Sequence, residues 1–248
     1  MFIPSIIHHR SCQGTFCKTF VTDTFGMLCW NVYKNNLKHP AFLPFMQKLT
    51  EKKQIDFLLF QEANFRNNLE CGLSDFAFEA AANLEYKGEF YGVLTASRVK
   101  AQKTKAYLSE GKESLFGPHK SLLLNYYPFG DGSQLLILNI HAINFRENQS
   151  YTKELKRFID LIENHKGPMI IAGDFNSWNI KRTQRLHSMR KALSLSTVPF
   201  LQAGKVKSFM GNHLDFIFYR GLKLLDSTVL DDHRLSDHNP LFAQFRRS

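Results

Sequence analysis

Four short polar clusters, far apart in the sequence, carry the residue types that bind metal ions and phosphate groups. Three of them follow apolar runs that are typical of buried strands, and the fourth precedes such a run. The clusters are Gln61-Glu62, Asn139 to His141, Gly173-Asp174-Phe175-Asn176 and Ser236-Asp237-His238-Asn239-Pro240. A carboxylate or imidazole at the edge of a core strand is costly unless a metal ion, a phosphate or another polar group uses it. We therefore expect all four clusters to converge on one site.

Glu62 is the first candidate metal ligand, because it lies just after the apolar run 57–60. A charged carboxylate in that position needs a partner. Mg²⁺ accepts one or two carboxylates and keeps water molecules for a substrate, which makes it a suitable partner. The alternative interpretation is an exposed glutamate in a loop, where charged side chains are common.

Asp174 and Asn176 lie two residues apart after Gly173. In an extended segment, side chains with this spacing point to the same face. A carboxylate beside an amide can orient a water molecule and hold a phosphoryl oxygen. The alternative is a simple turn, since Gly, Asp and Asn all favour turns.

Asp215 follows Leu214 inside an apolar strand, so it needs a specific partner. His238 is the best candidate, because a carboxylate fixes the tautomer of an imidazole and raises its basicity. Asp237 then remains free to face a metal ion or a phosphate. His141, at the end of another predicted strand, is either a catalytic acid or a structural histidine.

The elements that position these residues can be read from the apolar pattern. Strands are predicted at 26–31, 55–60, 76–82, 90–97, 120–127, 135–140, 169–172, 214–219, 222–230 and 241–245. Helices are predicted from Pro40, at 149–164 and at 180–193. The basic segment 98–118 is predicted to be a long exposed loop, and residues 1–24 a loose N-terminal arm. Many strands, few helices and no long linker indicate a single α+β domain over residues 25–248, with helices covering packed sheets.

The positive charge of the chain is unevenly distributed. The formal net charge is +10, and residues 146–207 contribute +7, from 12 Lys or Arg against 5 Asp or Glu. Residues 98–120 contribute another +4, from 6 against 2. This clustering favours attraction to a polyanion, with a merely solvated basic surface as the alternative.

The four cysteines are Cys12, Cys17, Cys29 and Cys71, and they form no CxxC pair. Reduced thiols in a cytosol are the simplest interpretation, and a Cys12–Cys17 bridge remains open. The apolar group 2–7 is too short for the core of a signal peptide, and no segment reaches the roughly 18 apolar residues of a membrane span. We expect a cytoplasmic, monomeric protein without an obligate protein partner.

Taken together and in this order, the clusters resemble the endonuclease/exonuclease/phosphatase superfamily, the fold of DNase I. The residues that carry the resemblance are Trp30-Asn31, Gln61-Glu62, Asn139-Ile140-His141, Gly173-Asp174-Phe175-Asn176, Leu214-Asp215-Phe216 and Ser236-Asp237-His238-Asn239-Pro240. Within that superfamily, the run 139–145 resembles the bacterial YafD-like branch, as do Gly167-Pro168, Trp178 and Tyr219-Arg220-Gly221.

The resemblance implies a four-layer α/β/β/α sandwich of two mainly antiparallel sheets, and a metal-assisted in-line attack on a phosphoester. It implies Mg²⁺ or Mn²⁺ as the cofactor. The metal ligands that it implies are Glu62, Asn31 and Asp237, and the substrate-binding residues are Asn31, Asn176 and His238.

The resemblance also implies a catalytic role for five residues. Asp174 aligns and deprotonates the attacking water, Asn176 donates to a phosphoryl oxygen, and His238 acts at the phosphate with Asp215 as its orienting partner. His141 takes the position that protonates the leaving oxygen. One departure is Tyr33, which stands where some nucleases of the family have an acidic residue, so a second metal-binding carboxylate is in doubt.

Three functions compete at this point. The basic segments favour a Mg²⁺-dependent phosphodiesterase that acts on nucleic acid. A phosphatase or phospholipase-type hydrolase on a small or lipid phosphoester could use the same site, because a fold does not fix a substrate. A binding protein with an inactive site is disfavoured, because every expected site residue is present.

Overall fold

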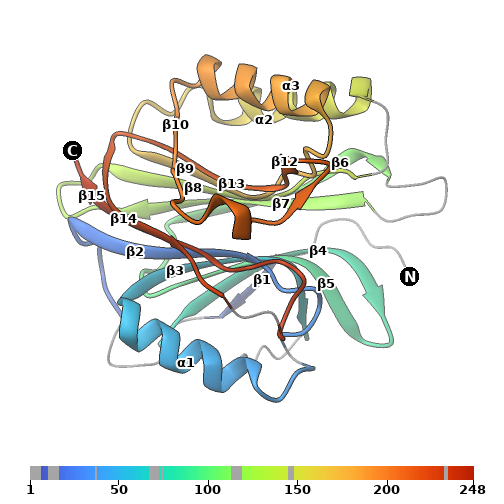
Figure 1. Ribbon diagram of the computed structural model, residues 1–248. Helices are drawn as coiled ribbons and strands as arrows, with labels where there is room; N and C mark the ends of the chain where they lie inside the picture. Colours follow the sequence, from blue (N-terminus) through green and yellow to red (C-terminus); the bar gives the residue numbers. More distant parts are fainter. Residues whose placement is uncertain are drawn as a thin grey trace.

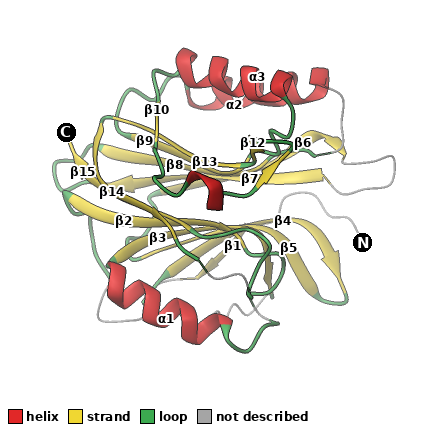
Figure 2. Ribbon diagram, in the orientation of Figure 1, coloured by secondary structure: helices red, strands yellow, loops and turns green. Residues whose placement is uncertain are grey.

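Two β-sheets packed face to face form the centre of the molecule, and helices cover their outer faces (Figure 1). The computed structural model describes residues 7–10, 17–36, 38–66, 73, 75–112, 119–144, 148–231 and 234–248. Figure 2 shows helix α1 below one sheet and helices α2 and α3 above the other. The four-layer α/β/β/α sandwich expected from the resemblance is therefore confirmed.

The first sheet has seven strands. Their order is β1 (Ile7–Arg10), β4 (Ala77–Tyr86), β5 (Glu89–Ser97), β3 (Ile55–Phe65), β2 (Thr24–Asn31), β15 (Leu241–Arg247) and β14 (Leu222–Val229). The second sheet has six strands, in the order β10 (Ser196–Thr197), β13 (Asp215–Arg220), β9 (Met169–Asp174), β8 (Gln134–His141), β7 (His119–Pro128) and β6 (Lys103–Lys112). Both sheets are mainly antiparallel, and the parallel pairs are β2 with β3 and β8 with β9.

The helices are α1 (Phe42–Lys53), α2 (Asn148–Ile162) and α3 (Ile180–Ala192). A 3₁₀ turn, η1 (Ala203–Lys205), and a small hairpin, β11 (Ser208–Phe209) with β12 (Asn212–His213), lie between α3 and β13. In α2, the buried residues Tyr151, Leu155 and Phe158 recur at helical spacing, so one apolar face packs on the second sheet.

Aromatic side chains fill the space between the two sheets. Phe57 of β3 meets Tyr127 of β7 edge to face, with ring centroids 4.9 Å apart, and Phe25 packs on Phe57 at 5.6 Å. Such contacts add to the large area that each ring buries. This core fixes the two sheets against each other, so residues at their common edge are held in defined positions.

Two expectations about the basic and N-terminal segments are wrong in part. Within 98–118, residues 103–112 form strand β6 at the edge of the second sheet, not a loop. An edge strand leaves one side open to solvent, so its lysines are tolerated and conceal the strand pattern. Within 1–24, residues 7–10 form strand β1, which pairs with β4. The domain boundary at residue 25 stays a prediction.

The cysteines differ from the simplest expectation. Cys29 is a buried free thiol in β2, whereas Cys17 is disulfide-bonded. The expectation of reduced thiols is therefore wrong at Cys17, and Cys12 and Cys71 lie outside the described residues. A cytoplasmic location stays a prediction, and the disulfide weighs against it because disulfides are rare in that compartment. In the described part of the chain, no helix combines the length and the apolar character needed to cross a bilayer.

Candidate active site

The strand directions bring the predicted site residues to one edge of the sandwich. In the first sheet, β2 and β3 are parallel, with Asn31, the last residue of β2, opposite Gln61 of β3. In the second, β8 and β9 are parallel, with His141 opposite Asp174. Strand β13 runs antiparallel to β9, so Asp215 at its start also lies opposite Asp174. Residues far apart in the sequence therefore meet.

Asp174 lies at the centre of the cluster and is only 3% exposed. The side-chain amide of Asn31, from the other sheet, donates to its Oδ2 at 3.0 Å. The backbone N–H of Asn176 donates to its Oδ1 at 2.9 Å. Nε2 of His141 lies 3.8 Å from Oδ2. The carboxylate is thus held on both oxygens, and it joins the two sheets at their edge.

The chain must pass very close to β8 where it delivers Asp174. Gly173 has φ +148°, and a Cβ there would lie 1.9 Å from the carbonyl oxygen of Ile140, so a larger residue does not fit. Asn176 follows with φ +48°, and its side-chain amide donates to the carbonyl of Ala142 at 2.9 Å. The turn after β9 is therefore fixed to the end of β8.

His238 and Asp215 form the second buried pair, as the sequence predicted. Nδ1 of His238 lies 2.7 Å from Oδ2 of Asp215, and both side chains are almost fully buried. Trp30 donates from its indole N–H to the His238 carbonyl at 2.8 Å. Ser236 donates to the Asn31 carbonyl at 2.6 Å, so the C-terminal cluster is attached to β2.

The sequence suggested that Glu62 lies at the end of a strand. In the structure it lies at an irregularity within β3. The register of β3 against β5 shifts between Phe60 and Ala63, and Glu62 has φ +49°. The irregularity turns the Glu62 carboxylate toward the site, where Oε1 lies 3.8 Å from Nε2 of His141. Bulges of this kind often re-aim a side chain beside an active site.

Gln61 and Asn139 have a structural part in the site. Both are fully buried, and the Gln61 amide donates to Oδ1 of Asn139 at 2.7 Å. Asn139 in turn donates to the carbonyls of Phe60 and Leu94, at 3.2 and 3.0 Å. This network links β8 to the first sheet.

Two lysines lie in the site that the sequence analysis did not assign to it. Nζ of Lys120, at the start of β7, lies 3.0 Å from Nε2 of His141, and the residue is only 8% exposed. Nζ of Lys34 lies 3.7 Å from Oε2 of Glu62. The signal for Lys120 was a charged residue at the start of the predicted strand 120–127, two positions before the apolar run 122–124.

Arg182 is a further residue whose importance the sequence did not reveal, because it looked like one of several basic residues on a helix. It is fully buried and donates to the carbonyls of Ile143 and Asn176 at 2.9 Å each. A third bond reaches the Asn144 carbonyl at 2.6 Å. Its guanidinium therefore holds together the loops that follow β8 and β9.

Asp237 lies at the rim of the site, away from the buried cluster. Its carboxylate is half exposed and forms an ion pair with Lys207 at 2.8 Å. The expected metal role of Asp237 remains a prediction.

The oxygen donors of the site are suitable for a hard divalent cation. Glu62 and Asp174 both face the same nitrogen of His141, and Asn31 adds an amide next to Asp174. A second group is formed by Asp174, Asp215 and His238, whose ligand atoms lie within 4.8 Å of one another. A cation in this second group would have to break the 2.7 Å pair between His238 and Asp215. The oxygen-rich set around Glu62 therefore fits Mg²⁺ or Mn²⁺ better.

Burial and neighbouring charges shift the proton affinities in the site. Burial, together with the nearby charge of Asp215, raises the pKa of Asp174 to about 6. Burial opposes protonation of His238, but the Asp215 carboxylate outweighs it and raises the pKa of His238 to about 9. Burial and then Lys120 hold the pKa of His141 below its ordinary value. At neutral pH the site thus combines a carboxylate base, an imidazolium and a neutral imidazole.

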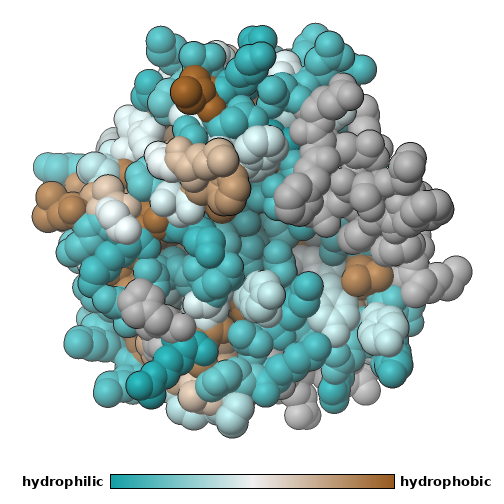
Figure 3. Space-filling model, turned by 45° about the vertical axis from the view of Figure 1, so that its right-hand side comes forward, coloured by the Kyte–Doolittle hydropathy of each residue, from teal (hydrophilic) through white to brown (hydrophobic). Residues whose placement is uncertain are grey.

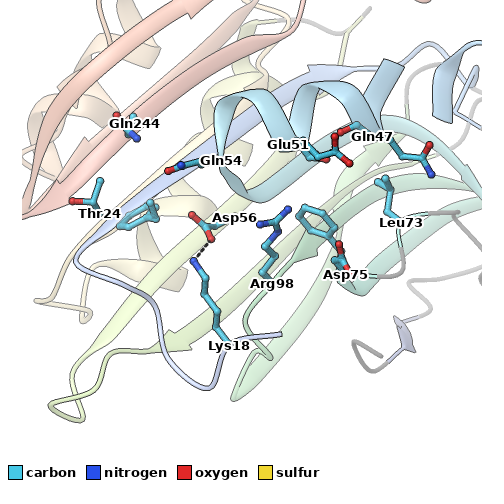
Figure 4. Close-up of a pocket in the computed structure, with 13 residues that line it drawn as sticks. Lys18, Thr24, Gln47, Glu51, Gln54, Asp56, Leu73, Asp75, Arg98 and Gln244 are labelled. Atoms are coloured by element: carbon cyan, nitrogen blue, oxygen red, sulfur yellow. Dashed lines mark hydrogen bonds and ion pairs between the residues drawn. The ribbon is translucent and has the colours of Figure 1, made fainter. Parts of the chain in front are cut away.

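A pocket of about 320 Å³ opens over this cluster and is lined by Asn31, Glu62, His141, Asp174, Asn176 and His238, among others. Another hollow, of about 730 Å³, lies between α1 and the other end of β2 and β3 (Figure 4). Its lining mixes cations and carboxylates, and its buried Asp56 is already paired with Lys18 at 2.6 Å. It contains none of the predicted site residues.

Comparisons with known proteins agree with this geometry. The chain matches the model of the Endonuclease/Exonuclease/phosphatase family over residues 28–238. It is 34% identical to a UPF0294 protein of Yersinia pseudotuberculosis over 228 residues, which cover 90% of this chain and 84% of that protein.

Solved structures share the fold at low sequence identity. An endonuclease/exonuclease/phosphatase family protein from Bacteroides thetaiotaomicron superposes with a TM-score of 0.70 at 16% identity, covering 91% of this chain and 98% of that one. A mannosyl-6-phosphatase from the same organism superposes with a TM-score of 0.64 at 16% identity, covering 89% and 99%.

The fold and the family match define a phosphoester hydrolase with a DNase I-like sandwich. The chain belongs to the Endonuclease/Exonuclease/phosphatase family, and within it to the branch of the UPF0294, YafD-like proteins.

Proposed function

We propose that this chain is a divalent-metal-dependent phosphodiesterase that cleaves nucleic acid by in-line attack of water. The observation that carries the proposal is the meeting of Asn31, Glu62, Asp174 and His238 in one pocket, although they come from four separate segments. Oxygen ligands, a buried base and a fixed cation are what hydrolysis of a phosphodiester anion requires.

A bound Mg²⁺ or Mn²⁺ neutralises charge on the phosphoryl oxygens and so lowers the barrier to attack. In this proposal Glu62, Asn31 and Asp237 would hold the ion. Asp174 takes a proton from the water molecule whose oxygen forms the new bond to phosphorus. The imidazolium of His238, positioned by Asp215, donates to a non-bridging oxygen, and Asn176 supports the same group.

The bond from phosphorus to the leaving oxygen breaks on the side of His141. A group that protonates or stabilises a leaving oxygen contributes about 10²–10⁴-fold to the rate. His141 and Lys120 together present positive charge and a transferable proton there. Lys120 thus adds to the role that the resemblance assigns to His141.

A basic groove between α2 and α3 supports a polyanionic substrate. The groove has a volume of about 740 Å³ and is lined by Lys153, Lys181 and Arg185, with only uncharged polar residues beside them. It begins near Asn148, at the same end of the sandwich as Asn144 in the catalytic pocket. Such a groove attracts the phosphates of a chain whose cleaved bond lies in the pocket.

Hydrolysis of a small phosphomonoester is the second candidate. It is favoured by the modest volume of the pocket and by the structural likeness to a protein named a mannosyl-6-phosphatase. A lipid substrate is less favoured, because on the face drawn in Figure 3 the described hydrophobic side chains form separate patches on a mainly hydrophilic surface.

A substrate panel tests the proposal. Wild-type protein is incubated with Mg²⁺ or Mn²⁺ and single-stranded DNA, duplex DNA, RNA, nucleotides, sugar phosphates, inositol phosphates or sphingomyelin. We expect cleavage of a nucleic acid that stops in EDTA and weakens steeply with salt. Phosphate release from monoesters with intact DNA and RNA would select the second candidate and contradict the first.

A further inference from the structure

Tyr33 stands out because its ring is exposed at the mouth of a pocket whose other residues are mostly polar. The side chain is among the lining of the catalytic pocket, and the residue is 56% exposed. Exposed aromatic residues are unremarkable alone on a surface. Next to a polar site, however, a flat ring offers an apolar surface, and water, a metal ion or a phosphate does not bind to such a surface.

The backbone at Tyr33 is held in a conformation that a bulky residue rarely adopts. Tyr33 has φ +48° and Lys34 has φ +63°, two consecutive residues in the left-handed region. Among the described residues other than glycine, eight have positive φ, and four of these line the catalytic pocket: Tyr33, Lys34, Glu62 and Asn176. Strain of this kind concentrates at functional sites and persists only where the surroundings enforce it.

The surroundings of this turn are the site itself. The Tyr33 N–H donates to Oδ1 of Asn31 at 3.1 Å, and the Lys34 N–H donates to the Glu62 carbonyl at 2.9 Å. The turn is therefore attached to two of the candidate metal ligands, Asn31 and Glu62, so the backbone that carries the ring is held beside the site. A rigid ring loses little conformational freedom when another group packs on it.

The charges around the ring match a nucleotide. Nζ of Lys34 lies 6.0 Å from the centre of the Tyr33 ring, and its side chain is half exposed at the same rim. Tyr91 also lines the pocket, and its hydroxyl donates to Glu89 at 2.8 Å, so its side chain is held in place. An exposed aromatic face with an ammonium beside it fits a base and its adjoining phosphate.

We infer that Tyr33 is a stacking platform for the nucleobase next to the cleaved phosphodiester. The inference rests on the proposed function and extends it, because it identifies the substrate as one that carries a base beside the scissile bond. It also gives a use to the position at which some family nucleases have an acidic residue. Stacking of a base on an aromatic ring changes affinity by about 5- to 150-fold when the ring is removed.

The test uses short single-stranded oligonucleotides in which one phosphodiester can be cleaved. In one substrate both neighbouring nucleotides carry bases, and in the other both are abasic tetrahydrofuran residues. The wild-type chain and the variants Tyr33→Ala, Tyr33→Phe and Tyr86→Ala are compared by kcat/KM with Mn²⁺. Tyr86 is the matched control, because it is equally exposed at 56% and does not line the pocket.

We expect that removing the bases lowers kcat/KM of the wild type by about 5- to 150-fold and leaves that of Tyr33→Ala almost unchanged. Tyr33→Phe and Tyr86→Ala should respond to base removal as the wild type does. If kcat/KM of Tyr33→Ala falls by the same factor relative to the wild type on both substrates, the inference is overturned, because the side chain would then act through the conformation of the turn and not through a base. If the wild type cleaves neither oligonucleotide, the proposed function fails, and this inference fails with it.

Discussion

Nζ of Lys120 lies 3.0 Å from Nε2 of His141, inside the pocket and almost out of contact with solvent. An ammonium group can only donate a hydrogen bond, so Nε2 of His141 is the acceptor and the imidazole is neutral. The lowered pKa of His141, caused first by burial and then by Lys120, agrees with this arrangement. The positive charge on this side of the pocket therefore belongs to the lysine.

Replacing Lys120 tests the importance of that charge. We predict that Lys120→Met lowers kcat by about 10²-fold or more for a substrate with an alkoxide leaving group. The loss should be much smaller for a p-nitrophenyl ester, whose leaving oxygen needs little stabilisation. Initial rates on the two substrates give the comparison, and Lys103→Met, on the exposed edge strand, is the control. Equal losses on both would count against a role at the leaving oxygen.

The same variant has a spectroscopic consequence. Because Lys120 lowers the pKa of His141, its removal should move that pKa upward. A titration of the His141 ring signals by NMR in both proteins measures the change. An unchanged titration would mean that the two side chains do not interact in solution.

The dependence of activity on pH follows from Asp174 and His238. In the proposed mechanism Asp174 must be ionised to accept a proton, so activity should rise with pH through about 6. A cation bound beside Asp174 would lower its pKa and move this rise to lower pH. His238 must stay protonated, so activity should fall as pH rises through about 9. In Asp215→Asn, the alkaline limb should shift to lower pH, because the carboxylate that raises the pKa of His238 is gone. A limb that stays in place would contradict the assigned pair.

Stability should change in the same pH range. His238 has a folded-state pKa near 9, against an ordinary value of 6.5, so folding favours its charged form. This contribution is fully present below about pH 6.5 and is lost as pH rises through about 9. Urea unfolding at several pH values measures it, and Asp215→Asn should flatten the decline between these limits.

Arg182 is predicted to be a major determinant of stability. Arg182→Met leaves two buried carbonyls and one partly buried carbonyl without their donor, and Glu154 loses a nearby positive charge. The cost should be about 3–5 kcal/mol in the free energy of unfolding. Arg185→Met, on the exposed side of the same helix, should stay within about 0.5 kcal/mol of wild type. Similar values for the two variants, measured in urea, would refute the structural role.

The basic groove between α2 and α3 should contribute to the binding of long nucleic acids. The double variant Lys153→Ala/Arg185→Ala should bind a long oligonucleotide more weakly, and the slope of log K against log salt should fall by about two. Its activity on a dinucleotide should not change. The control is Lys48→Ala/Lys52→Ala, on helix α1 in the opposite outer layer (Figure 1). A control that loses as much affinity would show only a general effect of net charge.

The sequence predicted most strands and helices correctly, because their apolar periods are strong, as in 149–164 and 169–172. It also anticipated the pair His238–Asp215, since an aspartate inside an apolar strand requires a partner. The irregularity at Glu62 and the pairing of Asp237 with Lys207 could not be predicted. Both depend on contacts between distant segments that no local pattern encodes.

Lys120 and Arg182 were missed for a related reason. In the sequence each is one basic residue among many, and only burial distinguishes it from the solvated ones. Strand β6 was missed because its lysines conceal the alternation of an edge strand. A charged residue adjoining an apolar run is the sequence signal that could have identified Lys120.

The rate of phosphodiester cleavage by Asp174→Asn is the most direct test of the account. Asp56→Asn is the matched control, since Asp56 is a similarly buried aspartate that lines the other hollow. We predict metal-dependent cleavage by the wild type and by Asp56→Asn, and a loss of at least about 10³-fold in a folded Asp174→Asn. Undiminished cleavage by Asp174→Asn would contradict the claim that these converging residues form the active site.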